Sequence, residues 1–208
     1  MYRLQEDYEE SIEIKKSKFI CYLHKCSCEQ EAKDFIQAIR KLHPNARHHC
    51  YAFLIGEHDE IQRSNDDGEP SGTAGIPMLE SLKKSHVQDI VAVTVRYFGG
   101  ILLGAGGLIR AYSQSVSTAL QHAPLTQKVT MQRYSLTFSY DFIGKLDYFF
   151  RQHNLLIESK DYDQKVTYTF LSTHPLDKEI SELTNGKYTP TFIQEEIVDL
   201  PINPEISF

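Results

Sequence analysis

The sequence predicts a two-domain α+β protein, and three observations support this fold class. The chain has 208 residues, whereas a single domain usually has about 100 to 150. Segments with the alternation of strands and segments with the apolar spacing of helices follow one another along its whole length. Pro124 ends a long helical segment, and the order of predicted helices and strands differs before and after it. We therefore predict domains at residues 1–125 and 126–208.

The composition is typical of a globular protein. Hydrophobic residues make up 41% of the chain and charged residues 24%, which argues against a disordered or fibrous protein. There is no run of about 18 apolar residues, and the first residues, MYRLQEDYEE, are acidic and polar, so we expect a cytoplasmic protein without a membrane span. The net charge of -6 argues against a generally basic coat, and any RNA site must therefore be local.

The first part of the chain begins with a predicted hairpin followed by a helix. Apolar residues alternate between Ser11 and Leu23, which predicts two short strands joined near Lys15–Lys18. Ser27 and Gln30 have the spacing of a capping box, and His43-Pro44 ends the helix that follows. The apolar stripe of this helix consists of Ala32, Phe35, Ile36 and Ile39.

Strands and a short helix are predicted in the next fifty residues. Cys50–Ile55 reads as a strand with a partner near Glu60–Arg63. The polar, turn-rich segment Ser64–Pro70 is expected to be exposed, and a short helix should follow at Ala74–Lys84. The β-branched run Asp89–Phe98 is typical of a central strand that is buried on both faces.

Five glycines follow this strand within nine residues, ahead of a long helix. Leu108, Tyr112, Val116 and Leu120 recur every four residues and predict the helix, with Gly106 and Gly107 immediately before it. A dinucleotide fingerprint would need glycine at Ile109, and a Walker A loop would need lysine at Ala105, so neither motif is present.

The second part of the chain predicts a small domain of its own. Its elements read strand, helix, strand, strand, helix, strand, which is the ferredoxin-like split βαβ pattern. The six predicted segments are Gln132–Ser139, Asp141–His153, Leu155–Lys160, Lys165–Leu171, Pro175–Asn185 and Tyr188–Val198.

The glycine loop is the first candidate site. Free backbone N–H groups and the positive end of the helix dipole would meet there and bind an anion. Arg96 and Arg110 flank the loop and could fork onto a phosphate, while Tyr97 or Phe98 could stack on a base. Each glycine could instead serve tight packing or a positive φ angle. The candidate residues are Arg96, Tyr97, Phe98, Gly99, Gly100, Gly104, Gly106, Gly107 and Arg110.

The acidic loop is the second candidate site. Asp66, Asp67 and Glu69 could bind a divalent ion such as Mg²⁺ or act as a general base, with Ser71 or Thr73 as a hydroxyl partner. A calcium loop is excluded because Arg63 would occupy its first ligand position. The alternative is an Asx-turn followed by a Ser/Thr cap of the helix near Ala74, which we favour.

The cysteines suggest neither disulfides nor a metal centre. Cys21, Cys26, Cys28 and Cys50 are few and clustered, and no second pair has zinc-finger spacing. A nucleophilic pair of Cys50 with a neighbouring histidine is disfavoured, because adjacent strand residues point to opposite faces. We expect ordinary thiols and no bound metal or cofactor, apart from the Mg²⁺ considered for the acidic loop.

Three motifs together resemble the IMPACT/YigZ family, in the expected order. They are ARHHCYAFLIG, DDGEPSGTAGIPML and VRYFGGILLGAGGLIRAY, and the resemblance covers about Ser11 to Leu120. The chain after Thr126 is similar to the small second domain of bacterial members. The resemblance places Arg47, His48, Asp66, Asp67, Gly68, Glu69, Ser71, Gly72, Thr73, Gly75 and Tyr112 in the family motifs, together with the glycine-loop candidates, and implies no catalytic assignment.

The resemblance also implies a fold and a functional context. It implies an N-terminal domain like the second domain of ribosomal protein S-five and a C-terminal domain like the last domain of elongation factor G. Both of these relatives touch ribosomal RNA. Eukaryotic members regulate translational stress signalling through a protein partner and an additional RWD-type domain. This chain begins almost directly at the shared core, so we do not extend that role to it.

Three functional hypotheses follow. We favour binding of RNA or a ribosomal site through Gly99–Arg110 over an enzyme. The second is a small-molecule or phosphate-directed enzyme that uses Asp66, Asp67, Glu69 and His48. The third is a protein-interaction regulator of translation that recruits a translation-related protein. The acidic loop argues against the first hypothesis, since like charge near phosphate repels.

Overall fold

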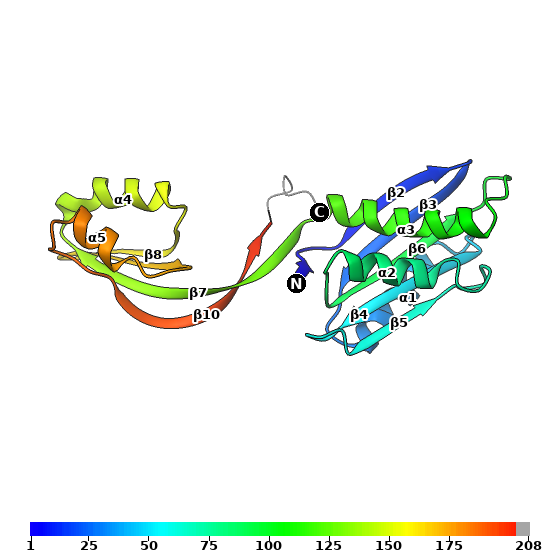
Figure 1. The fold of residues 1–208 in the computed structure, drawn as a ribbon, viewed down its shortest axis with the longest axis horizontal. Helices are drawn as coiled ribbons and strands as arrows, with labels where there is room; N and C mark the ends of the chain where they lie inside the picture. The colour runs from blue at the N-terminus through cyan, green and yellow to red at the C-terminus, as the bar shows by residue number, and fades with distance from the viewer. Residues whose placement is uncertain (203–208) are drawn as a thin grey trace. The chain divides into compact units, whose positions relative to one another are not determined.

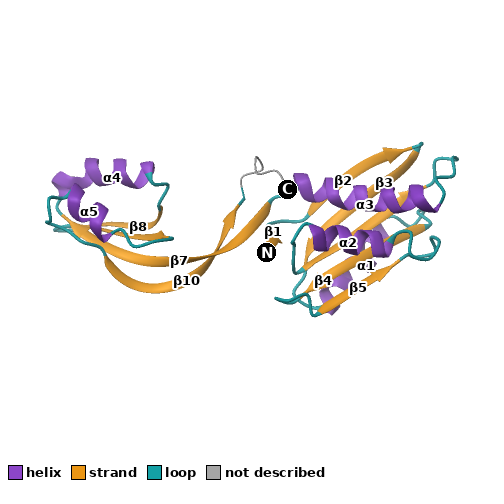
Figure 2. Cartoon of the chain, viewed as in Figure 1, coloured by secondary structure: helices purple, strands orange, loops and turns teal. Residues whose placement is uncertain are grey.

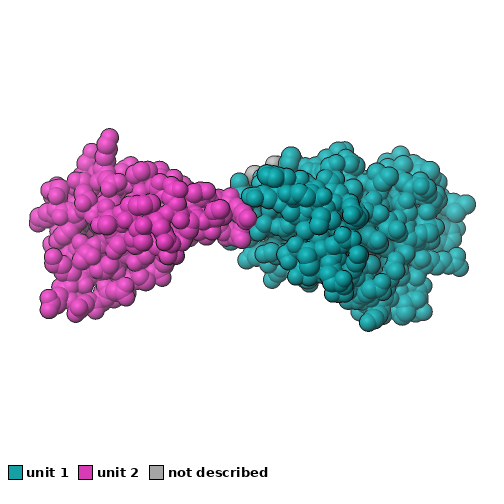
Figure 3. Space-filling view, turned by 90° about the horizontal axis from the view of Figure 1, so that it is seen from below, with its two compact units in different colours: residues 1–127, 200–208 teal, residues 128–199 magenta. Residues whose placement is uncertain are grey.

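The computed structural model describes residues 1–202 and contains two compact units. Unit 1 consists of residues 1–127 and the segment that begins at Leu200, and unit 2 of residues 128–199 (Figure 3). This division lies two residues after the predicted boundary at residue 125, because the strand that begins at Leu125 first pairs with the N-terminal strand of unit 1. Residues 203–208 of the predicted second domain lie outside the described residues.

Unit 1 has three layers built on a five-stranded antiparallel sheet (Figures 1 and 2). The strand order is β2-β3-β6-β4-β5. Helices α2 and α3 cover one face and α1 covers the other. The elements are β1 (Tyr2–Leu4), β2 (Tyr8–Ile14), β3 (Ser17–Lys25), α1 (Glu29–Leu42), β4 (His48–Ile55), β5 (Ile61–Asn65), α2 (Gly75–Lys84), β6 (Ile90–Tyr97) and α3 (Ala105–His122).

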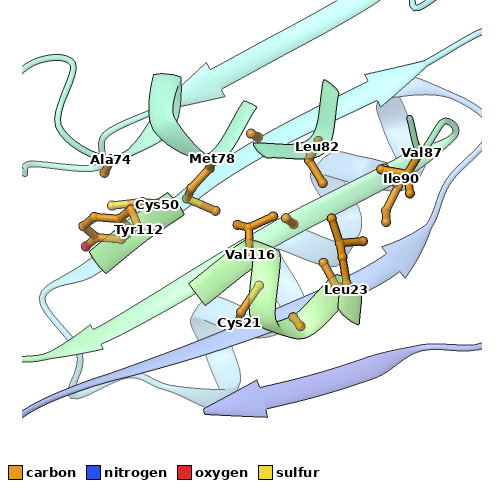
Figure 4. Close-up of a cluster of buried hydrophobic side chains, with 14 of the residues drawn as sticks. Cys21, Leu23, Cys50, Ala74, Met78, Leu82, Val87, Ile90, Tyr112 and Val116 are labelled. Carbon is orange, nitrogen blue, oxygen red and sulfur yellow. The ribbon is translucent and has the colours of Figure 1, made fainter. Parts of the chain in front are cut away.

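The core of unit 1 lies on both faces of this sheet, as the apolar patterns predict. Leu23, Cys50 and Ile90 of the sheet pack against Met78 of α2 and Tyr112 of α3 (Figure 4). Strand β6 is the central strand and is buried from Ile90 to Arg96, which confirms the expectation for the β-branched run. None of the helices within residues 1–202 combines the length and apolar composition needed to cross a membrane.

The predicted capping box of the first helix is wrong. The N-cap of α1 is Cys28, and its side chain makes no capping hydrogen bond. The backbone N–H and the hydroxyl of Ser27 donate to Glu31 instead, at 2.6 and 2.9 Å. Gln30 donates to Asp34 at 2.9 Å along the helix surface. Helix α1 begins later than the sequence pattern predicts, so Glu31 rather than Gln30 comes within reach of Ser27.

The long helix begins earlier than predicted. Helix α3 starts at Ala105, with Gly104 as N-cap at a φ of 69°, so Gly106 and Gly107 lie inside its first turn. The N–H of Leu108 donates to the carbonyl of Gly104 at 2.9 Å, which closes the first helical hydrogen bond. The N–H groups of residues 105–107 therefore have no acceptor within the helix.

Unit 2 confirms the predicted βαββαβ order. Its strands have the order β10-β7-β9-β8, and its buried apolar residues join helices α4 and α5 to the sheet. Strand β7 begins seven residues before the predicted Gln132, since its first residues pair with β1. The elements are β7 (Leu125–Phe138), the 3-10 helix η1 (Tyr140–Phe142), α4 (Ile143–Gln152), β8 (Leu156–Tyr162), β9 (Val166–Ser172), α5 (Asp177–Leu183) and β10 (Thr191–Pro201).

Gly99 packs against the turn between β2 and β3. A Cβ atom at Gly99 would lie 1.9 Å from the carbonyl oxygen of Lys16, where no side chain fits. The N–H of Gly99 donates to the hydroxyl of Ser17 at 3.2 Å. By contrast, a Cβ at Gly106 would meet only the Arg110 guanidinium, at 3.8 Å. Of these two glycines, only Gly99 is required by packing.

This difference predicts opposite effects of two alanine substitutions. Gly99→Ala should destabilise unit 1 by about 1 to 3 kcal/mol or more, because backbone must move away from the new Cβ. Gly106→Ala should leave stability unchanged or raise it by up to about 1 kcal/mol, because alanine is the better helix former. Urea unfolding followed by circular dichroism measures both. Equal losses for the two variants would contradict the packing assigned to Gly99.

Candidate functional site

Three loops meet at one end of unit 1. They are the β2–β3 turn, the acidic loop 66–74 after β5 and the glycine loop 98–104 after β6. Figure 1 shows this end beside the N-termini of α2 and α3. The sequence candidates from the acidic loop and the glycine loop therefore lie at the same end of the sheet.

Asp66 caps helix α2 from a distance. Its carboxylate accepts hydrogen bonds from the N–H groups of Gly72, Ala74 and Gly75 at 2.8 to 2.9 Å. Burial by itself would raise the pKa of Asp66, but these backbone hydrogen bonds outweigh burial and hold the pKa below its ordinary value. The expected Ser/Thr cap is wrong, because Thr73 donates to the carbonyl of Pro70 at 2.6 Å.

Asp67 joins α1 to the start of β4. Its Oδ1 accepts from the Arg40 guanidinium at 2.6 Å, and its Oδ2 accepts from the N–H of His49 at 2.7 Å. Its carbonyl oxygen lies 2.9 Å from Nδ1 of His48. Both carboxylate oxygens of Asp67 therefore have protein partners.

Glu69 forms a buried ion pair, so the predicted exposure of the acidic loop is wrong at this residue. Its Oε1 accepts from Arg96 and from the hydroxyl of Tyr112, both at 2.8 Å. The Arg96 and Glu69 side chains are only 8% and 4% exposed. The Arg96 guanidinium lies near two aromatic rings, 5.5 Å from the ring centre of Phe19 and 5.6 Å from that of Phe98. Arg96 is therefore not the free phosphate ligand that we expected.

These contacts give each of the three proposed acids a protein partner. Asp66, Asp67 and Glu69 each serve as acceptors for protein donors, which is a structural role. Within residues 1–202, no three His, Cys, Asp or Glu side chains are grouped so that they could hold a metal ion. Ser71, the proposed hydroxyl partner, is exposed, whereas Thr73 is buried. Gly68 and Gly72 have φ angles of 86° and 76° and shape the loop.

Cys50 also has a structural place. It is fully buried, and its thiol donates to the carbonyl of Asp66 at 2.9 Å. Burial raises the pKa of this thiol far above its ordinary value. Nε2 of the neighbouring His49 lies 3.1 Å from the carbonyl of His43. Cys50 therefore lies in the core of unit 1, as an ordinary buried thiol does.

A pocket of about 580 Å³ lies at this end of the sheet. It is lined by Asn45, Arg47, His48, Arg96, Tyr97, Phe98 and Leu102. The sequence predictions included five of these seven residues but not Asn45 and Leu102, which no motif marks. Because a carbonyl oxygen only accepts, Nδ1 of His48 carries the proton in its hydrogen bond to Asp67. In this Nδ1–H tautomer the lone pair is on Nε2.

Cations without ion-pair partners lie at the same end of unit 1 as the pocket. Arg47 and Arg110 are exposed, as are three lysines of the β2–β3 turn and β3, namely Lys15, Lys16 and Lys18. Among the residues that the structure describes, none of the five forms an ion pair. The three lysines belong to the run KKSK, a charge pattern that our sequence predictions did not use.

The glycines of the loop have different roles. Gly99 is required by packing, and Gly100 and Gly104 have φ angles of 85° and 69°. Gly106 and Gly107 lie in the first turn of α3 and expose its free N–H groups. The anion-binding prediction therefore applies to the helix terminus rather than to the turn.

Asp66 predicts a pH-dependent loss of stability. Asp66→Ala should cost about 1 to 3 kcal/mol at neutral pH, because three N–H groups lose their acceptor. Folding lowers the pKa of Asp66, so this stabilisation is present above its unfolded pKa of about 3.9 and is lost as pH falls through the folded value. Urea unfolding of both proteins from pH 7 to pH 3 checks this. A difference between them that does not shrink on acidification would contradict the assignment.

The buried ion pair predicts non-additive effects. Arg96→Met alone should cost about 3 to 5 kcal/mol, because it leaves the Glu69 carboxylate buried without its cation. The double variant Arg96→Met/Glu69→Leu should cost clearly less than the sum of the two single variants. A double-mutant cycle in urea measures this coupling. Additivity within about 0.5 kcal/mol would show that the pair does not act as a unit.

Comparison with known proteins follows the same two units. The sequence profile of the Impact N-terminal domain matches residues 15–120, and a domain of unknown function, DUF1949, matches residues 136–187. The chain is 47% identical over 190 residues to the IMPACT family member YvyE of Bacillus subtilis, covering 89% of this chain and 88% of the relative. It is 43% identical over 152 residues to YigZ of Escherichia coli, covering 72% and 74%.

A solved structure is also similar over nearly the full chain. A crystal structure of a hypothetical protein has a TM-score of 0.59 and 34% sequence identity, covering 94% of this chain and 98% of that chain. The Impact N-terminal match includes every residue that lines the pocket. The sequence motifs, the domain matches and these relatives agree: the chain belongs to the IMPACT family.

Proposed function

We propose that this protein binds single-stranded RNA of the translation apparatus at the pocket end of unit 1. One observation carries the proposal. The three carboxylates of the acidic loop are bound to protein donors, whereas five cations at the same end of unit 1 have no ion-pair partner within residues 1–202. Exposed cations are therefore gathered at this end of unit 1, although the whole chain has a net charge of -6.

The acidic loop therefore does not oppose phosphate binding as its sequence suggests. A carboxylate that accepts hydrogen bonds and has a nearby arginine presents little negative field to solvent. Asp67 is paired with Arg40, and Glu69 is paired with Arg96. No metal ion is needed to neutralise the loop in this proposal.

The positions of the cations suit contacts with an RNA backbone. Arg47 lines the pocket, and Lys18 lies opposite Tyr97 in the β3–β6 register. Lys16 belongs to the turn that packs against Gly99, and Arg110 lies beside Gly106 at the start of α3. Lysine and arginine side chains and helix N-termini are the usual partners of phosphate groups.

Phe98 offers a platform for a base. Phe98 is 53% exposed, and the Arg96 guanidinium lies over its ring, 5.6 Å from the ring centre. Single-stranded RNA is commonly held by stacking unpaired bases on aromatic rings. Tyr97 and Leu102 line the pocket together with Phe98. These features favour a single strand over a duplex, whose bases are not accessible for stacking.

The family supports a role in translation. The resemblance of its two domains to ribosomal protein S-five and elongation factor G points to RNA of the ribosome as the ligand. This inference is an analogy of fold, and the experiment below tests it directly.

Salt dependence tests the proposal. Each phosphate contact of a single strand contributes about 0.7 to the slope of log affinity against log salt. The double variant Arg47→Gln/Arg110→Gln should therefore bind purified ribosomes and a labelled RNA oligonucleotide more weakly, with a slope lower by about 1.4. Co-sedimentation and fluorescence anisotropy from about 50 to 200 mM salt measure the two effects.

A matched control removes the same charge elsewhere. Arg63 of β5 and Arg151 of α4 are exposed and lie outside the pocket lining. Arg63→Gln/Arg151→Gln should leave the salt slope unchanged. Equal slopes for both double variants would remove Arg47 and Arg110 from the site. An unmodified protein that fails to bind RNA at about 50 mM salt would overturn the RNA proposal in favour of an enzyme or a protein-interaction role.

A further inference from the structure

We infer that the pocket is a subsite for one unstacked guanine base. This inference rests on the proposed function, because the base belongs to the RNA strand whose phosphates contact the surrounding cations. Its basis is the combination of fixed donors, a fixed acceptor and aromatic walls in one cavity of about 580 Å³.

The hydrogen-bonding groups of the pocket are mixed. Arg47 and Arg96 supply donors only, and Asn45 supplies both a donor and an acceptor. His48 supplies an acceptor, since its Nδ1 proton is used in the hydrogen bond to the carbonyl of Asp67 at 2.9 Å. A ligand that satisfies this set must offer acceptors and donors together.

A phosphate group fits this set poorly. Its oxygens only accept, so with the Nδ1–H tautomer of His48 they would leave Nε2 without a donor. The charge of Arg96 is already compensated by Glu69 at 2.8 Å. The pocket itself therefore favours a neutral, planar ligand, whereas Arg47 at its edge and Arg110, Lys15 and Lys16 outside it remain available for the backbone.

Guanine matches the set best among the four bases. Its O6 and N7 are adjacent acceptors that suit Arg96, since Glu69 uses only Nη1 of that guanidinium, and arginine is a common specific contact to these two atoms of guanine. Its N1–H and N2–H₂ groups are donors for an acceptor such as Nε2 of His48. The corresponding edge of adenine has only one acceptor, N7, beside a donor. A purine also stacks over a larger area of the Phe98 ring than a pyrimidine does.

The pocket walls are held in place before any ligand binds. Arg96 is fixed by Glu69 and by the rings of Phe19 and Phe98. The hydroxyl of Tyr97 lies 2.9 Å from Nδ1 of His43, and Nε2 of the same ring lies 2.6 Å from the hydroxyl of Tyr22. Fixed hydrogen-bonding groups increase discrimination between ligands, because a wrong base leaves them unpaired.

A series of oligonucleotides tests this inference on the full chain. Five labelled nine-nucleotide RNAs differ only at the central position, which carries guanine, adenine, cytosine, uracil or no base, in a background of uracil. The guanine oligonucleotide should bind at least about five-fold more tightly than the all-uracil one, and the abasic one should bind most weakly. Fluorescence anisotropy at about 50 mM salt measures all five affinities.

Two variants assign the preference to the pocket. His48→Asn places an amide N–H near the position of Nδ1, so it keeps the donor to Asp67 and leaves no acceptor at the position of Nε2, because its own carbonyl oxygen lies near the former Cδ2. It should reduce the preference for guanine to less than about two-fold and leave the abasic affinity unchanged. Asn45→Ala is a second probe, at an exposed residue outside the acidic loop. It should selectively weaken binding of the guanine oligonucleotide. Arg110→Gln is the matched control and should weaken all five by a similar factor.

The outcomes separate this inference from the function on which it rests. Equal, salt-sensitive affinities for all five oligonucleotides would overturn the base pocket and leave RNA binding intact. A preference for adenine, cytosine or uracil would overturn the assignment of guanine. A guanine preference that survives both His48→Asn and Asn45→Ala would overturn its location in this pocket. Failure of every oligonucleotide to bind would overturn both proposals.

Discussion

The buried carboxylate of Glu69 is the interaction on which this end of the molecule depends. A charged group removed from water is tolerated only when donors surround it, and Glu69 receives hydrogen bonds from Arg96 of β6 and Tyr112 of α3. These bonds connect the acidic loop, the central strand and the long helix. Because Arg96 must remain beside Glu69, its guanidinium is fixed against Phe98 and forms a wall of the pocket.

The other two acids of the loop extend the same principle. Asp66 supplies acceptors to the start of α2, where no nearby serine or threonine does so, and Asp67 connects α1 to β4. The carboxylates of all three acids thereby accept hydrogen bonds from donors within unit 1. An acidic protein can consequently present a local positive surface, since the arginines and lysines nearby are not needed to neutralise the loop.

The glycines between Gly99 and Gly107 look like one motif in the sequence, but they meet different structural requirements. Gly99 permits the β2–β3 turn to approach, and Gly104 permits the left-handed φ angle that precedes α3. Gly106 has neither requirement, and its N–H lies at the open end of the helix. The density of glycine therefore reflects packing and chain geometry at some positions and access to the helix terminus at others.

The sequence by itself determined the two-domain α+β class, the order of the elements and the family, because apolar periodicity, turn residues and motifs are local properties of the chain. The central strand after Asp89 and the βαββαβ order of the second unit were predictable for this reason. Only the tertiary structure decided which charges are free. Arg96 and Glu69 are 27 residues apart in sequence, and Tyr112 and Glu69 are 43 apart. Whether such groups pair depends on burial and on distances between elements, which local patterns do not encode.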